Sequence, residues 1–184
     1  MRHLIDFGDL TRAEWESLYQ RCSDIMDHPA DFMDACRGRV MASLFYEPST
    51  RTNFSFQTAM LRVGGTVFGF ADPKSTSTAK GETLKDTIKM VSGYADVVVM
   101  RNPKEGAAKA ASLYSDVPVI NAGDGGHMHP TQTTADLTTI TRLRGKVDGL
   151  SVGLCGDLKN GRTVHSLIKA LAKFEGIKFS SSPP

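Results

Sequence analysis

Cysteine is scarce in this chain, whose 184 residues include 3 cysteines. Cys22, Cys36 and Cys155 are far apart and form no CxxC pair, which argues against a disulfide scaffold or a thiolate metal site. We interpret each as an unpaired thiol in a reducing compartment and expect it to be a small core residue.

Long apolar runs and blocks of like charge are also missing. No apolar stretch approaches the roughly 20 residues that span a bilayer, and no basic segment leads into an apolar one at the amino terminus. The 22 basic and 20 acidic residues give a formal net charge of +2 and form no block that would follow a nucleic-acid backbone. The sequence therefore predicts a cytoplasmic protein without nucleic-acid or membrane partners.

The composition is that of an ordinary globular protein, with 40% hydrophobic and 23% charged residues. The length permits one domain, or one domain and part of another. The chain can therefore bury a real core.

The most informative stretch is a polar turn between two apolar elements. Residues 39–46 form an apolar run of strand length, and apolar residues recur at near-helical spacing over 54–63. Between them lies the run Tyr-Glu-Pro-Ser-Thr-Arg-Thr over 46–52. A helix start exposes unpaired N–H groups, and Arg51 adds a permanently charged forked donor, so an oxyanion suits this junction. Ser49 or Thr50 could instead merely cap the helix, and this run alone favours neither interpretation.

Strands and helices alternate along the rest of the chain. Thr11 and Glu14 form a capping-box pattern that predicts a helix to about Asp27. Alternation of this kind predicts an α/β fold with a parallel, covered sheet. The expected later strands lie at 66–70, 96–100, 117–121, 150–155 and 177–179, and the expected later helices at 82–94, 105–114, 130–144 and 162–174.

Further segments place polar residues at the ends of predicted strands and the starts of predicted helices. They read GYADVVVMR over 93–101, NAGDG over 121–125, HPTQT over 129–133 and GDLKNGRTVHSL over 156–167. Together with the polar turn, and in this order, they resemble the aspartate carbamoyltransferase (aspartate transcarbamoylase) catalytic chain. The resemblance covers nearly the whole sequence, and several of its motifs are six residues or longer, so chance matching is a poor explanation.

The resemblance implies a domain organisation and an activity. Residues 1–149 would form a carbamoyl phosphate domain, a parallel sheet with helices on both faces. Residues 150–184 would supply the first βαβ unit of a second, aspartate-binding α/β domain that is mostly absent from this sequence. The implied reaction transfers the carbamoyl group of carbamoyl phosphate to L-aspartate in pyrimidine biosynthesis. It needs no metal or cofactor, because an activated acyl donor requires only positioning and charge stabilisation.

The resemblance also assigns roles to residues. Ser49, Thr50, Arg51 and Thr52 would hold the phosphate, with Thr52 reaching toward the carbamoyl group. Arg101 would bind both the phosphate and the carbonyl oxygen. His129 would bind the carbamoyl oxygen, Gln132 the carbamoyl nitrogen, and Arg162 an aspartate carboxylate. Ser77 and Lys80 would enter the site of a neighbouring subunit in a homotrimer.

Each of these residues has a plainer interpretation. Arg101 and Arg162 could be solvated, since arginine is mostly exposed in folded proteins. His129 could be satisfied at a helix start, and although His127 lies near enough for a metal pair, no set of ligands at metal spacing accompanies it. Residues 75–82 could be a disordered surface connection. In open parallel sheets, however, ligands sit outside the carboxyl ends of strands, where Ser49, Arg101 and His129 all fall.

One departure from the family concerns the helix after the polar turn. The family often has arginine at the position of Asn53 and glutamate at that of Gln57, which are neighbours on one helix face. Because both charges are missing together, the change is typical of a neutral replacement of an ion pair.

Two other functions remain open from the sequence. An ornithine carbamoyltransferase would share the phosphate turn, although the segments 129–132 and 161–166 favour the aspartate enzyme. The chain could also be a carbamoyl phosphate-binding module without turnover.

Overall fold

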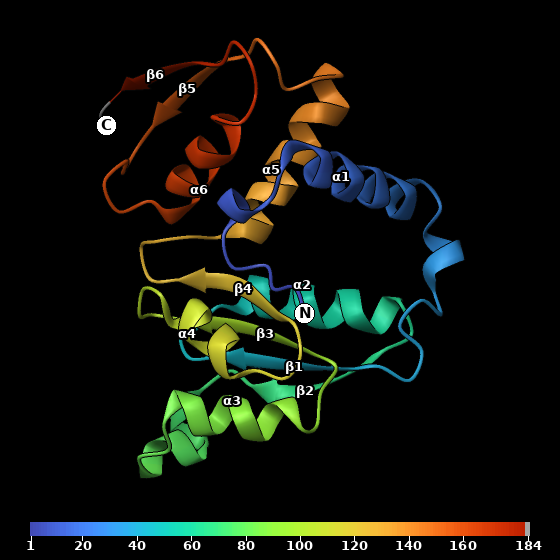
Figure 1. Ribbon diagram of the computed structural model, residues 1–184, viewed down its shortest axis with the longest axis vertical. Helices are drawn as coiled ribbons and strands as arrows, with labels where there is room; N and C mark the ends of the chain where they lie inside the picture. Colours follow the sequence, from blue (N-terminus) through green and yellow to red (C-terminus); the bar gives the residue numbers. More distant parts are fainter. Residues whose placement is uncertain (183–184) are drawn as a thin grey trace.

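The computed structural model of the chain describes residues 1–182 (Figure 1). Residues 183 and 184 of the expected second domain lie outside the described residues. A four-stranded sheet has the order β2-β1-β3-β4, and every pairing in it is parallel. Its strands are β1 (Val40–Phe45), β2 (Thr66–Phe70), β3 (Val97–Asn102) and β4 (Val119–Asp124).

The two faces of the sheet are covered by different helices, as the sequence predicts. Alternate residues of a strand point to opposite faces. In β1, Ala42 and Leu44 pack into a core cluster with α3 and α4, whereas Met41 and Phe45 pack into a second cluster with α2. The helices that cover the sheet are α2 (Thr50–Arg62), α3 (Leu84–Ser92), α4 (Ala107–Tyr114) and α5 (Pro130–Arg144).

A second, smaller unit follows α5. The strands β5 (Ser151–Cys155) and β6 (Lys178–Ser182) pair in parallel on either side of α6 (Arg162–Leu171), which is the expected βαβ unit. A third core cluster, which includes the fully buried Leu137 and Leu171, joins this unit to α5 and to the helix α1 (Arg12–Asp27). Figure 1 shows β5, β6 and α6 at the end of the molecule opposite β2 and α3.

Local sequence signals place two helices correctly. Thr11 and Glu14 form the predicted capping box at the start of α1, and Pro130 is the first residue of α5. Strand ends are less well predicted, because β3 and β4 continue to Asn102 and Asp124. Asn102 and Asp124 are in register with each other in the sheet. The sequence of either segment alone does not reveal a pairing between strands that stabilises both ends.

Three features differ from the predictions or add to them. Leu4 forms an isolated parallel bridge with Ile120 and so extends the sheet beyond β4. Cys155 is exposed, so its prediction as a core residue is wrong: it ends β5 in a sheet of two strands. The segment 75–82 is ordered into short helical turns, η3 (Pro73–Ser75) and η4 (Ser77–Lys80), rather than being a disordered connection. Among the described residues, no helix is both long and apolar enough to cross a membrane.

Candidate active site

Three polar segments meet at the carboxyl edge of the four-stranded sheet. The polar turn follows Phe45 at the end of β1, and Phe45 is in register with Arg101 near the end of β3. Asn102, the last residue of β3, is in register with Asp124, the last residue of β4. Since parallel strands all end at the same edge, the turn, Arg101 and the loop after β4 share one side of the sheet.

Two arginines converge there on a single carboxylate. Arg101 donates from Nε to Oε1 of Glu47 at 2.6 Å, and Nη1 of Arg162 lies 3.4 Å from the same oxygen. The side chains of Arg101 and Arg162 are only 12% and 19% exposed, so the solvated alternatives are wrong for both. Burial lowers the pKa of the Arg101 guanidinium, and the nearby positive charge of Arg162 lowers it further. The hydrogen bond to Glu47 acts in the opposite direction and raises this pKa.

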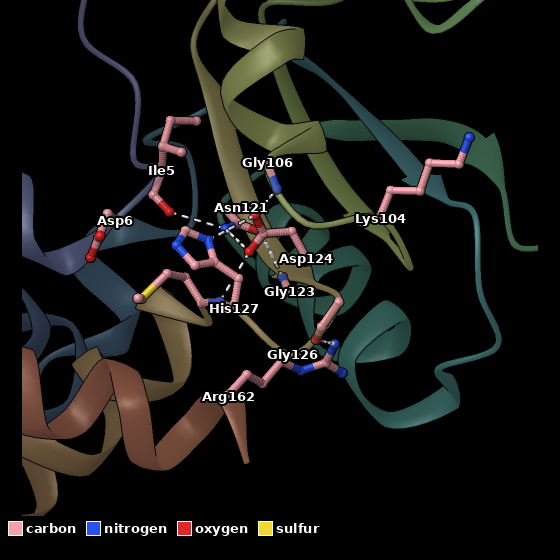
Figure 2. Close-up of polar contacts among 12 residues, drawn as sticks. Ile5, Asp6, Lys104, Gly106, Asn121, Gly123, Asp124, Gly126, His127 and Arg162 are labelled. Atoms are coloured by element: carbon pink, nitrogen blue, oxygen red, sulfur yellow. Dashed lines mark hydrogen bonds and ion pairs between the residues drawn. The ribbon is translucent and has the colours of Figure 1, made fainter. Parts of the chain in front are cut away.

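Asp124 organises the loop that leads from β4 to α5. Its buried carboxylate accepts hydrogen bonds from the backbone N–H of Gly106 at 2.9 Å and of Met128 at 3.1 Å, and from the Asn121 amide at 3.0 Å. Nδ1 of His127 lies 3.3 Å from the same carboxylate. Figure 2 shows these groups around Asp124, with Arg162 approaching the same loop from α6. The loop is therefore fixed from within before it reaches His129.

Helix α6 fixes the same loop from outside. Arg162 donates to the carbonyl of Gly125 at 2.7 Å, and one turn later the hydroxyl of Ser166 accepts from the backbone N–H of His129 at 2.8 Å. Gly123 has a φ of +118°, and a Cβ there would come within 3.2 Å of the Arg162 guanidinium carbon. Only glycine fits both constraints at this position.

His129 occupies the N-cap position of α5 and is 7% exposed. Its pKa is lowered from 6.5 to about 4 by burial first, then by the positive charges of Arg162 and Arg101, while Asp124 acts in the opposite direction. The imidazole is therefore neutral at pH 7, with one ring N–H as a donor. A neutral donor beside two guanidinium groups can polarise a carbonyl oxygen and stabilise a developing negative charge.

The polar turn itself is open. Ser49 is the N-cap residue of α2, yet its side chain makes no capping hydrogen bond. Capping by the Ser49 side chain, the plainer interpretation of this residue, is therefore wrong. Arg51 and Thr50 are exposed, Ser49 and Thr52 are partly buried, and Arg51 makes no ion pair within residues 1–182. The first helical turn thus offers free backbone N–H groups and an unpaired guanidinium.

Three predicted substrate ligands lie outside this cluster of contacts. Gln132 is exposed and donates its amide to Asp136, one turn further along α5, at 2.9 Å. Ser77 and Lys80 are exposed on the segment between β2 and α3, away from α6 (Figure 1). Their predicted roles need a rotamer change for Gln132 and a second subunit for Ser77 and Lys80.

Sequence reasoning missed Glu47, Asp124 and Ser166. Glu47 lies inside the predicted phosphate run, where an acidic residue opposes the expected charge, and that contradiction was the available signal. Asp124 stands in a quoted motif, but a buried carboxylate that organises a loop has no local pattern. Ser166 needs the fold, because its partner is distant in sequence. Within residues 1–182, no group of three or more His, Cys, Asp or Glu side chains is arranged to hold a metal.

Comparison with known proteins identifies relatives of this chain. Residues 2–142 match the family model described as aspartate/ornithine carbamoyltransferase, carbamoyl-P binding domain. The aspartate carbamoyltransferase catalytic subunit of Clostridium perfringens is 56% identical over 178 residues, which are 97% of this chain and 58% of the relative. That of Clostridium kluyveri is 52% identical over 183 residues and is 60% covered. The chain thus spans less than two thirds of the length of these relatives.

Solved structures share the same fold. The catalytic subunit of M. jannaschii aspartate transcarbamoylase superposes with a TM-score of 0.91 at 49% identity, over 100% of this chain and 61% of that chain. Aspartate transcarbamoylase from Trypanosoma cruzi, in complex with N-(phosphonacetyl)-L-aspartic acid, superposes with a TM-score of 0.92 at 39% identity, over 100% of this chain and 60% of that chain.

Proposed function

The chain belongs to the aspartate/ornithine carbamoyltransferase family, and on that premise we propose that it transfers the carbamoyl group of carbamoyl phosphate to L-aspartate. The products would be N-carbamoyl-L-aspartate and phosphate. The choice of aspartate over ornithine is supported by the relatives, which are named as aspartate enzymes. A Trypanosoma cruzi relative has been solved with carbamoyl phosphate and aspartate, which supports the same pair of substrates here.

One observation carries this proposal from the structure. Arg101 and Arg162 both reach the Glu47 carboxylate, and their charges also act on His129, which burial keeps neutral. Two partly buried guanidinium groups that converge on one carboxylate can also bind the anionic groups of a substrate. An anionic substrate that replaces Glu47 would gain charge-assisted hydrogen bonds from groups already in place.

The proposed mechanism assigns each group one task. Ser49, Thr50, Arg51 and Thr52 bind the phosphate through hydroxyls, backbone N–H groups and the Arg51 guanidinium. Arg101 binds both the phosphate and the carbonyl oxygen. The roles of the remaining ligands follow the family pattern. His129 donates to the carbamoyl oxygen, Gln132 holds the carbamoyl nitrogen, and Arg162 binds an aspartate carboxylate. The neutral amine of aspartate forms a bond with the carbonyl carbon, the bond from that carbon to the phosphate oxygen breaks, and the proton that the nitrogen loses leaves with the phosphate. The positive groups stabilise charge on both oxygens during this step.

We further propose that the active unit is a homotrimer with shared sites. Ser77 and Lys80 are exposed, and Figure 1 shows their segment between β2 and α3 at the end of the molecule away from α6, so both side chains are available to another copy. A heterologous interface that closes after three copies gives each site one such segment. In this proposal residues 1–149 form the carbamoyl phosphate domain, and residues 150–184 begin the aspartate domain.

We propose that this reaction serves pyrimidine biosynthesis. We place it in the cytoplasm, because unpaired cysteines suit a reducing compartment and Cys22, Cys36 and Cys155 are all free thiols. The residues with proposed roles supply positioning and charge stabilisation, so the proposed step needs no metal or cofactor.

The test is an assay for N-carbamoyl-aspartate with the purified chain, with ornithine as the alternative acceptor. We expect product from aspartate and none from ornithine. Calorimetric titration with inorganic phosphate accompanies it, because a binding module without turnover would bind phosphate and form no product. Product from ornithine alone, or no binding and no product, would overturn the proposal.

A further inference from the structure

Three polar side chains lie in a row behind the first turn of α2. Ser43, on the α2 side of β1, donates from Oγ to Oδ1 of Asn53 at 2.8 Å, and Gln57 donates from Nε2 to the same oxygen at 2.8 Å. Ser43 is 1% exposed and Asn53 is 6% exposed. A single buried amide oxygen therefore joins β1, an inner strand of the sheet, to the helix that follows the polar turn.

Within residues 1–182, two α-helices begin with a side-chain cap, whereas α2, α4, α5 and α6 begin without one. Thr11 caps α1 and Thr83 caps α3, each accepting a hydrogen bond from a backbone N–H in the first turn. Ser49 makes no such bond at the start of α2, where the backbone N–H of Asn53 donates to the Ser49 carbonyl at 3.0 Å. A side-chain cap would engage the hydroxyl and one of the N–H groups that a phosphate needs. Without such a cap these groups stay free, and the hydrogen bond from Ser43 to Asn53 ties the start of α2 to β1.

We propose that Asn53 is a positioning residue for the phosphate site, holding the first turn of α2 against β1 through Ser43. The anchor lies behind the turn, so the Ser49 hydroxyl and the N–H groups of residues 50–52 stay available to a ligand. The proposal rests on the proposed function, since it assumes that the turn binds the phosphate of carbamoyl phosphate. It also gives a reason for the residue types at positions 53 and 57. The side-chain amides of Asn53 and Gln57 are joined by a hydrogen bond where the resembled family often has an ion pair.

A merely structural role predicts something different. Loss of a buried hydrogen bond lowers the stability of any fold, wherever the bond lies. A positioning role adds a loss of phosphate affinity, because binding would then have to order the turn as well. The two roles are separated by measuring both quantities on the same variants.

The experiment titrates inorganic phosphate into the full 184-residue chain by calorimetry, with thermal unfolding recorded in parallel. The variants are Ser43→Ala, Asn53→Ala and the double variant, with Arg51→Ala as the test of the site itself. Ser92→Ala is the matched control, because Ser92 is 7% exposed and its hydroxyl donates to a backbone carbonyl in α3.

We expect Ser43→Ala and Asn53→Ala each to weaken phosphate binding about fivefold, the effect of one lost hydrogen bond. The double variant should bind about as well as Asn53→Ala alone, since both changes break the same link. Ser92→Ala should lower the unfolding temperature and leave the affinity unchanged.

If Ser43→Ala and Asn53→Ala both fold and bind phosphate with unchanged affinity, this inference is overturned. The proposed function still stands in that case if Arg51→Ala weakens phosphate binding. Binding that does not depend on Arg51 would overturn both. If Asn53→Ala does not fold, the smaller change Ser43→Ala decides alone.

Discussion

The low pKa of His129 makes the stability of the fold depend on pH in a calculable way. Folding lowers this pKa from 6.5 to about 4, mainly through burial and secondly through the charges of Arg162 and Arg101. Between these two values the unfolded chain binds a proton that the folded chain does not. The stabilisation from His129 is therefore fully present above pH 6.5 and is lost as the pH falls toward 4.

The size of the effect follows from the same two values. A pKa difference of this size corresponds to about 3 kcal/mol in full, of which about 2 kcal/mol is lost between pH 7 and pH 5. Other groups titrate over this range as well, among them His3, whose pKa is also lowered by burial. The contribution of His129 must therefore be isolated by comparison with a variant.

The assay is urea unfolding of the wild type and of His129→Gln at pH 7 and pH 5. We expect the wild type to lose about 2 kcal/mol more than the variant on acidification. His28→Gln, which replaces an exposed histidine, should behave like the wild type. Equal losses in the wild type and His129→Gln would refute the reasoning, because His129 would then not be held neutral by the fold.

Three further predictions address the site, the core and the assembly. Arg51→Ala should lower the rate of N-carbamoyl-aspartate formation by about 10²–10³, because it removes a charge-stabilising donor, and a near-normal rate would refute its role. Leu137→Ala should lower the free energy of unfolding by about 2–5 kcal/mol, because Leu137 is fully buried where α5 meets α1 and α6. Leu143→Ala, at a side chain 78% exposed in the same helix, is its control, and equal losses in urea unfolding would contradict the assigned core. In a mixture of inactive Arg51→Ala and Lys80→Ala subunits, some sites combine the intact Arg51 of one subunit with the intact Lys80 of another, so activity should return. A mixture that stays inactive would contradict shared sites.

The sequence predicted elements best where the signals were local. The capping box of Thr11 and Glu14 and the helix-starting Pro130 lie at the observed ends of α1 and α5. The alternation of strands and helices was enough to predict the parallel sheet and the βαβ unit after it. Leu4 was missed because its bridge to Ile120 depends on a pairing between segments more than 100 residues apart in the sequence.

The candidate site was predicted residue by residue but not in its contacts. Arg101, His129 and Arg162 were all named, and the structure brings them together through hydrogen bonds, burial and charge. Glu47 was not expected to hold Arg101 and Arg162, since only the folded chain shows that both guanidinium groups reach it. The roles of all the named site residues stay predictions, and those of Ser77, Lys80 and Gln132 depend in addition on a partner subunit or a rotamer change.

The account depends on the polar turn, Arg101 and His129 acting as one anion site. The most direct measurement is an NMR titration of the chain with inorganic phosphate, following the backbone amides of Thr50, Arg51 and Thr52, the Arg101 Nε and the His129 ring. The account predicts that all of these signals shift together with a single dissociation constant. Shifts confined to one group, or different constants for the turn and for His129, would contradict it.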